Sequence, residues 1–168
     1  MSEGYHSSFV EYVVENYDDS TCILEIGAGL HSTKVFAEKY KVYSVESKQQ
    51  FINAYHDNYI HVPLDLATQW YKPDVLHDAL PDDYDLLILD GPEGLYRPPM
   101  VLPDKMVVRY GFYTISWPFI KKDVPIIVDD TNRPHQELKV VAALKGEGYE
   151  IDIREGFTVC TPSRKTEN

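Results

Sequence analysis

Two glycines and two acids near the N-terminus have the spacing of a nucleotide-binding site. Gly27 and Gly29 directly follow the apolar run Ile23–Ile26, which contains one acid, Glu25. A second acid, Glu46, comes about 20 residues after the first glycine, at the end of another apolar run. Glycines permit a tight turn and a close ligand approach, and an acid at this distance suits the hydroxyls of a ribose. The stretch therefore predicts a site for an adenosine-containing ligand.

Three further acids follow two later apolar runs. Asp90 comes after Tyr84–Leu89, and Asp129 and Asp130 come after Pro125–Val128. Open α/β sheets bind ligands beyond the carboxyl ends of their strands, so we expect these carboxylates to converge near the reacting group. One of them would serve as the general base on a substrate hydroxyl, or together they would hold a divalent cation such as Mg²⁺.

The elements that must position these residues alternate along the chain. We expect strands at 22–26, 41–46, 59–64, 84–90 and 125–129, and helices at 7–16, 33–40, 51–55, 105–121 (bent near Pro118) and 134–146. Two last strands, 149–154 and 157–162, are joined tightly at Glu155-Gly156 as a hairpin. Alternating strands and helices predict a parallel sheet with helices on both faces. Residues 67–81 give no clear prediction, and the proline-rich loop 91–103 is long enough to expect a functional role.

Five strand–helix units closed by a hairpin resemble the class I S-adenosylmethionine (SAM)-dependent methyltransferase fold. That resemblance implies a Rossmann-like, mostly parallel seven-stranded sheet with an antiparallel C-terminal hairpin strand. It covers nearly the whole chain, which we expect to form one SAM-binding domain at 1–162 followed by a flexible tail at 163–168.

The first motif of this family, an acid followed by two spaced glycines, matches Glu25 to Gly29. By this resemblance, the acid helps to fix the amino-acid end of SAM, Glu46 binds the ribose, and an acid after the third strand holds the adenine amino group. The cofactor-binding residues implied are Glu25, Gly27, Ala28, Gly29, Ser32, Glu46, Ser47, Asp65 and Asp90. A nicotinamide cofactor fits less well, because its fingerprint needs a third glycine where Ser32 stands and the chain lacks room for a second catalytic domain.

Two branches of the family resemble this chain in the region of Asp90, Asp129 and Asp130. Catechol-type, metal-dependent O-methyltransferases are similar in using acids after the fourth and fifth strands, which implies Asp90, Asp129 and Asp130 as metal ligands. Their last pair is Asp-Asn, whereas this chain has Asp129-Asp130. The metal requirement therefore stays open at this point.

Glucuronoxylan-type polysaccharide methyltransferases resemble this chain in two short motifs, Asp90-Gly-Pro-Glu-Gly94 and Asp130-Thr-Asn-Arg133. This resemblance implies O-methylation of a sugar or sugar acid, with Arg97 or Arg133 binding a carboxylate or phosphate. His135 is a second candidate base. The predicted catalytic set is Asp90, Asp130, Arg133 and His135, acting on a hydroxyl or carboxyl of a small molecule or saccharide.

Composition excludes some classes of function. The formal net charge is −11, which argues against a nucleic-acid partner, and the Asn-Pro-Pro-Tyr motif of amino-methylating nucleic-acid enzymes is absent. No signal peptide and no membrane-spanning run is visible. Cys22 and Cys160 lie far apart in apolar runs, as in a reduced cytoplasmic protein.

Two rival functions remain open. An aminopropyltransferase-like enzyme would use the same scaffold with decarboxylated SAM and a cationic acceptor, although the N-terminal β-domain expected from that family is missing. A non-catalytic module that binds adenosine or a partner protein is the other. The methyl acceptor and the oligomeric state are not determined by the sequence.

Overall fold

The computed structural model describes residues 8–92, 107–132 and 136–164, and its centre is a seven-stranded sheet. The strand order is β3-β2-β1-β4-β5-β7-β6. Neighbours among the first five strands are parallel, whereas β7 runs antiparallel to both β5 and β6. The strands are β1 (Cys22–Ile26), β2 (Lys41–Glu46), β3 (Tyr59–His61), β4 (Leu86–Leu89), β5 (Ile126–Asp129), β6 (Tyr149–Ile153) and β7 (Phe157–Pro162). The predicted mostly parallel sheet with its closing hairpin is confirmed.

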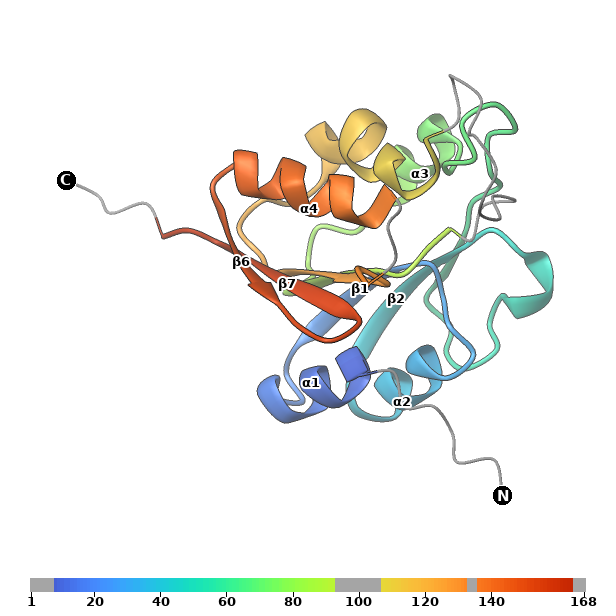
Figure 1. Ribbon diagram of the computed structural model, residues 1–168. Helices are drawn as coiled ribbons and strands as arrows, with labels where there is room; N and C mark the ends of the chain where they lie inside the picture. The colour runs from blue at the N-terminus through green and yellow to red at the C-terminus, as the bar shows by residue number, and fades with distance from the viewer. Residues whose placement is uncertain (1–7, 93–106, 133–135, 165–168) are drawn as a thin grey trace.

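Helices cover both faces of this sheet, as predicted. In Figure 1, α1 (Ser8–Asn16) and α2 (Ser32–Lys39) lie on one face, and α3 (Pro73–Ala79) and α4 (Gln136–Gly146) lie on the other. The central strands β1 and β4 are buried along their whole length. Their side chains alternate between two apolar clusters: Ile23 belongs to the cluster that contains Phe9 and Phe36, and Leu24 belongs to the one that contains Trp70 and Leu144.

The predicted elements around β3 are shorter in the structure. The expected helix at 51–55 is only one 3₁₀ turn, η1 (Gln49–Phe51), because the chain turns at Asn53, whose φ is 59°. The expected strand 59–64 pairs with β2 only over β3, since Pro63 has no N–H to donate to a ladder. Leu64 instead forms an isolated antiparallel bridge with Tyr71.

The helix expected at 105–121 is irregular in its described part. It consists of short turns: η2 (Val108–Tyr110), the π-type turn η3 (Phe112–Ser116) and η4 (Trp117–Phe119). The close contact between Gly111 and the Trp70 ring, the positive φ of Val108 (46°) and Pro118 each interrupt regular helical geometry. Residues 105–106 and most of the predicted loop 91–103 lie outside the described residues.

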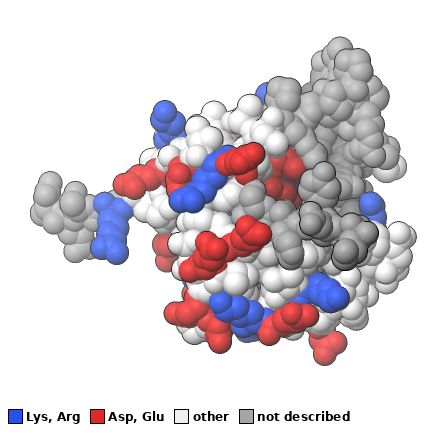
Figure 2. Space-filling model, turned by 60° about the horizontal axis from the view of Figure 1, so that its bottom comes forward, with Lys and Arg blue, Asp and Glu red and all other residues white. Residues whose placement is uncertain are grey.

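Charged side chains are spread over the surface. Figure 2 shows one face on which described acidic and basic residues are interspersed. No helix in the described ranges is long and apolar enough to cross a membrane. The start of the predicted tail is described, with the Ser163 hydroxyl donating to the Gly148 carbonyl, and residues 165–168 lie outside the described part.

Candidate active site

A cavity of about 340 Å³ lies beyond the carboxyl ends of β1, β2 and β4. Strands β1 and β4 are neighbours, and the chain order runs outward from them in opposite directions, which makes this the switch point of the sheet. The residues lining the cavity come from the loops after these three strands and from the chain beyond β3. In the described part of the chain they are Gly27, Ala28, Gly29, Leu30, Glu46, Ser47, Lys48, Phe51, Tyr71, Asp90, Gly91 and Pro92.

Gly27 brings the loops after β1 and β4 into backbone contact. Its φ is 92°, and a Cβ placed on it would lie 2.4 Å from the Gly91 nitrogen. A Cβ on Gly91 would in turn lie 2.7 Å from the Gly27 Cα. The sequence predicts that Gly27 and Gly29 lie close to a ligand. In the structure, Gly27 is also required by the packing of one cavity wall against the other.

Glu25 lies beneath the glycine loop and is fully buried. It accepts hydrogen bonds from Ser32 (3.1 Å), Thr33 (2.7 Å) and Ser44 (2.8 Å). Thr33 Oγ1 also accepts from the Gly29 N–H at 2.9 Å. Glu25 and Ser32 are not among the cavity-lining residues, so this network shapes the loop from behind.

Burial raises the pKa of Glu25 to about 7, against the three hydroxyl hydrogen bonds, which act to lower it. The network reaches the protein surface through His56, whose Nε2 lies 2.8 Å from Ser44 Oγ. The Asn58 N–H donates to His56 Nδ1 at 3.0 Å, so the neutral ring carries its proton on Nε2 and donates to Ser44. Burial also lowers the pKa of His56, which favours that neutral ring.

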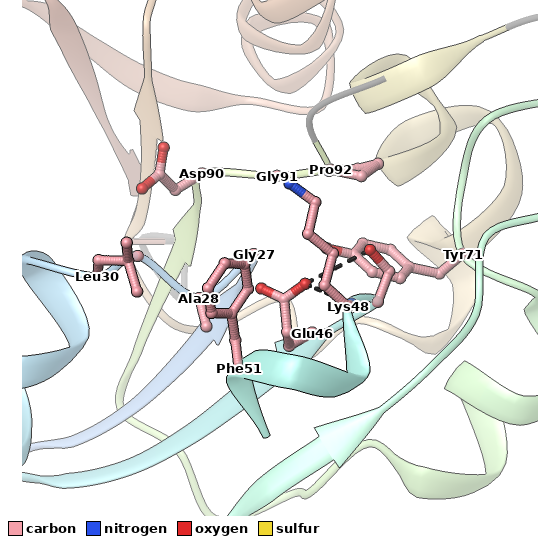
Figure 3. Close-up of a pocket in the computed structure, with 12 residues that line it drawn as sticks. Gly27, Ala28, Leu30, Glu46, Lys48, Phe51, Tyr71, Asp90, Gly91 and Pro92 are labelled. Atoms are coloured by element: carbon pink, nitrogen blue, oxygen red, sulfur yellow. Dashed lines mark hydrogen bonds between the residues drawn. The ribbon is translucent and has the colours of Figure 1, made fainter. Parts of the chain in front are cut away.

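The far wall of the cavity is built around Glu46. Its side chain faces the cavity, and its Oε1 accepts from the Lys48 N–H at 2.7 Å and from Ser47 Oγ at 3.4 Å (Figure 3). Phe51 and Tyr71 flank it, and the Lys48 side chain extends across the cavity toward Gly91. The sequence analysis did not assign these last three to the site. The sequence predicts only a helix at Phe51, and Tyr71 falls in a stretch without clear periodicity.

Asp65 lies away from the cavity lining. Its Oδ1 accepts from the N–H groups of Ala67 (3.0 Å) and Thr68 (2.9 Å) and from the Thr68 hydroxyl (3.2 Å). These backbone and side-chain bonds to Thr68, together with the one to Ala67, lower the pKa of Asp65. In this structure the carboxylate closes a turn after β3, and its predicted contact with adenine remains a prediction.

The three acids at the ends of β4 and β5 do converge. Carboxylate oxygens of Asp90, Asp129 and Asp130 lie within 4.8 Å of one another. Burial, the Asp129 charge and a hydrogen bond to Asp129 raise the pKa of Asp90, and burial raises the pKa of Asp129. The pair therefore binds a proton more readily than an isolated aspartate does.

Arg109, which the sequence analysis did not single out, lies beside this acid cluster. Its Nη1 is 3.0 Å from Asp130 Oδ2 and 3.2 Å from Glu137 Oε1. Nothing in the local sequence marks it, because it stands in a segment expected to be an ordinary helix. The predicted site residues Arg133 and His135, and the alternative Arg97, lie outside the described residues.

Comparison with known proteins gives structural neighbours only: no protein-family model and no curated protein sequence matches the chain. Solved methyltransferase structures do superpose. The TehB-like SAM-dependent methyltransferase of Corynebacterium glutamicum matches with a TM-score of 0.53 at 12% identity, over 92% of this chain and 86% of that one. The chain has the class I methyltransferase fold.

Two further neighbours were solved with ligands. The magnesium protoporphyrin IX methyltransferase ChlM of Synechocystis, with bound SAM, gives a TM-score of 0.52 at 13% identity, over 93% of this chain and 77% of that one. MycE from the mycinamycin biosynthetic pathway, in complex with Mg and S-adenosylhomocysteine (SAH), gives 0.54 at 14% identity. The match covers 95% of this chain and 47% of MycE, so this chain spans about half the length of that neighbour.

Proposed function

We propose that this protein is a SAM-dependent methyltransferase. The observation that carries the proposal is the cavity at the switch point, which has a buried acid, Glu46, on one side of the glycine loop and Asp90 on the other. Neighbours of the same fold were solved with SAM or SAH, which supports the same class of cofactor here.

The residues present fit this cofactor. Glu46 already accepts from the Lys48 N–H through Oε1, so it is held in place to accept hydroxyl protons of a ribose. Phe51 offers an aromatic face on the same wall, suited to an adenine ring (Figure 3). The loop Gly27–Gly29 and the main chain at Asp90 and Gly91 would then border the amino-acid end and the sulfonium.

The acid cluster would prepare an oxygen nucleophile. Asp90 and Asp129 lie at the ends of adjacent strands, where burial raises the pKa of both carboxyls, and Asp130 lies beside them. In its deprotonated form the pair would accept a proton from an acceptor hydroxyl while that oxygen attacks the methyl group in line, breaking the bond from sulfur to the methyl carbon and releasing SAH. We therefore infer O-methylation, with a small molecule or saccharide as the acceptor.

A divalent cation also fits the donor set, because three carboxylates within 4.8 Å of one another are the hard oxygen ligands that Mg²⁺ prefers. When bound, such an ion would acidify a coordinated hydroxyl. Asp90, Asp129 and Asp130 would hold it, and at Asp130 the ion would compete with the Arg109 guanidinium, whose Nη1 lies 3.0 Å from Oδ2. The structural neighbour MycE was solved in complex with Mg and SAH, and also in complex with Mg, SAH and mycinamycin VI.

Isothermal titration with SAM and SAH tests the cofactor assignment. We expect both to bind, and we expect Glu46→Ala to weaken binding by about tenfold to a hundredfold, because a charge-assisted contact of roughly 1.5–3 kcal/mol is lost. Glu150→Ala is the matched control, since Glu150 is exposed on β6. Failure of both ligands to bind at millimolar concentration would refute the proposal.

Product analysis separates the rival functions on the same scaffold. SAM with a radiolabelled methyl group is incubated with a panel of sugars, sugar acids and small phenols. We expect the label to appear on an acceptor in this panel, and we expect Asp90→Asn to reduce the rate of transfer. Propylamine transfer from decarboxylated SAM to putrescine would instead favour the aminopropyltransferase alternative. Cofactor binding without transfer to any acceptor would favour the non-catalytic module.

A further inference from the structure

Arg109 is a buried arginine surrounded by oxygen atoms. The residue is 4% exposed, and each of its three side-chain nitrogens donates to a protein acceptor. A guanidinium is charged at every accessible pH and has five N–H donors in a planar fork, so it can serve several acceptors at once. A cation buried this deeply must be compensated by the groups around it.

Two of these acceptors belong to the cavity wall. Arg109 Nη2 donates to the Asp90 carbonyl at 2.9 Å, and Nε donates to the Pro92 carbonyl at 3.4 Å. These carbonyls stand on either side of Gly91, the residue whose backbone packs on Gly27. Arg109 therefore holds the main chain that borders both the proposed cofactor site and the acid cluster.

The other acceptors are the acids themselves. Arg109 Nη1 contacts Asp130 Oδ2 at 3.0 Å and Glu137 Oε1 at 3.2 Å, and Nη2 lies 3.9 Å from Asp90 Oδ1. Glu137 is 6% exposed, and its Oε2 has no hydrogen-bond partner among the residues that the structure describes. The neighbouring carboxylates of Asp90, Asp130 and Glu137 raise the pKa of Arg109 against the effect of its burial. The positive charge of this one side chain is thus shared among the acids that directly follow β4 and β5 and an acid of α4.

We propose that Arg109 is the resident cation of the acid cluster, a positioning residue that competes with a divalent metal ion for Asp130. The same oxygen cannot point fully at both a metal and the guanidinium, and a nearby positive charge repels an incoming cation. The inference deepens the proposed function, because Asp130 and the Asp90 main chain would be set for methyl transfer by a protein side chain.

Manganese binding tests this competition directly. Mn²⁺ is titrated into the wild type, Arg109→Gln and Arg109→Lys, and bound ion is measured by electron paramagnetic resonance. We expect Arg109→Gln to bind Mn²⁺ at least about tenfold more tightly than the wild type, because one positive charge within a few ångströms is removed. Arg109→Lys keeps the charge with fewer contacts and should fall between them.

The double variant Arg109→Gln/Asp130→Asn should lose the gained affinity, which locates the ion at the cluster. Equal Mn²⁺ affinity in the wild type, Arg109→Gln and Arg109→Lys would overturn the proposal. If Arg109→Gln does not fold, the wild type and Asp130→Asn still test the proposal. Micromolar Mn²⁺ binding by the wild type that Asp130→Asn abolishes would show that Arg109 does not prevent a cation from binding at the cluster.

Titrating the same samples with SAH distinguishes failure of the Arg109 proposal from failure of the methyltransferase proposal. Absence of SAH binding to the wild type would refute the methyltransferase proposal while leaving the Mn²⁺ result for Arg109 intact. A structural role alone would make Arg109→Gln less stable without creating a Mn²⁺ signal. The gain of a bound-ion spectrum is therefore the decisive readout.

Discussion

A single buried carboxylate, Glu25, connects the protonation state of the protein to its stability. Its pKa is raised from 4.5 to about 7 by burial, so the folded protein holds this proton to a higher pH than the unfolded chain does. The stability associated with the neutral acid is present below pH 4.5 and is lost as the pH rises toward 7. The loss would be on the order of 3 kcal/mol, from about 1.4 kcal/mol per pKa unit.

Glu25→Gln should remove this dependence, since glutamine is neutral throughout and keeps an oxygen for the surrounding hydroxyls. We expect the difference in unfolding free energy between wild type and Glu25→Gln to change steadily between pH 4.5 and 7, measured by urea denaturation at each pH. Glu150→Gln, on the exposed edge strand β6, is the control and should follow the wild type. Parallel curves for wild type and Glu25→Gln would contradict the role of Glu25.

At the scale of elements, the loops after β1 and β4 depend on one glycine contact. Gly27→Ala would strain a φ of 92° and also place a Cβ 2.4 Å from the Gly91 nitrogen, a backbone atom that cannot rotate away. We expect a loss of about 2–5 kcal/mol in unfolding free energy, the sum of backbone strain and overpacking.

Gly148 provides a matched control for that prediction. Its φ is also 92°, and apart from its chain neighbours no atom of the described residues lies within 4 Å of a Cβ placed on it. Gly148→Ala should therefore cost only the backbone term, about 1 kcal/mol, and leave SAH affinity unchanged. Equal losses in the two variants, measured by urea denaturation, would show that the contact between the two loops contributes nothing.

The same elements show how far sequence reasoning reaches. Strands with continuous apolar runs, such as Leu86–Leu89, were predictable because burial on both faces requires that composition. The convergence of Asp90 with Asp129 followed from strand order alone. The turn of Asp65, the break at Asn53 and the position of Arg109 depend on local hydrogen bonding and tertiary contacts, for which single residues give no periodic signal.

For the whole molecule, the cavity joins loops from β1, β2 and β4, so a ligand bound there would stabilise the central sheet as a unit. A ligand that binds only the folded protein adds about 2.7 kcal/mol at a hundred times its Kd. For a domain of this size, that corresponds to a rise in Tm of about 5–10 °C.

Thermal unfolding with SAH at that concentration should show this rise, and Glu46→Ala at the same SAH concentration should show much less. NAD⁺ is the comparison ligand, because a nicotinamide cofactor is the alternative that the sequence disfavours: its glycine motif needs a third glycine where Ser32 stands. A larger shift with NAD⁺ than with SAH would reverse the cofactor assignment. Glu46 suits the ribose of either cofactor, so a smaller rise in Tm for Glu46→Ala shows that the ligand binds in this cavity. The difference between the Tm shifts with SAH and with NAD⁺ then identifies the class of cofactor.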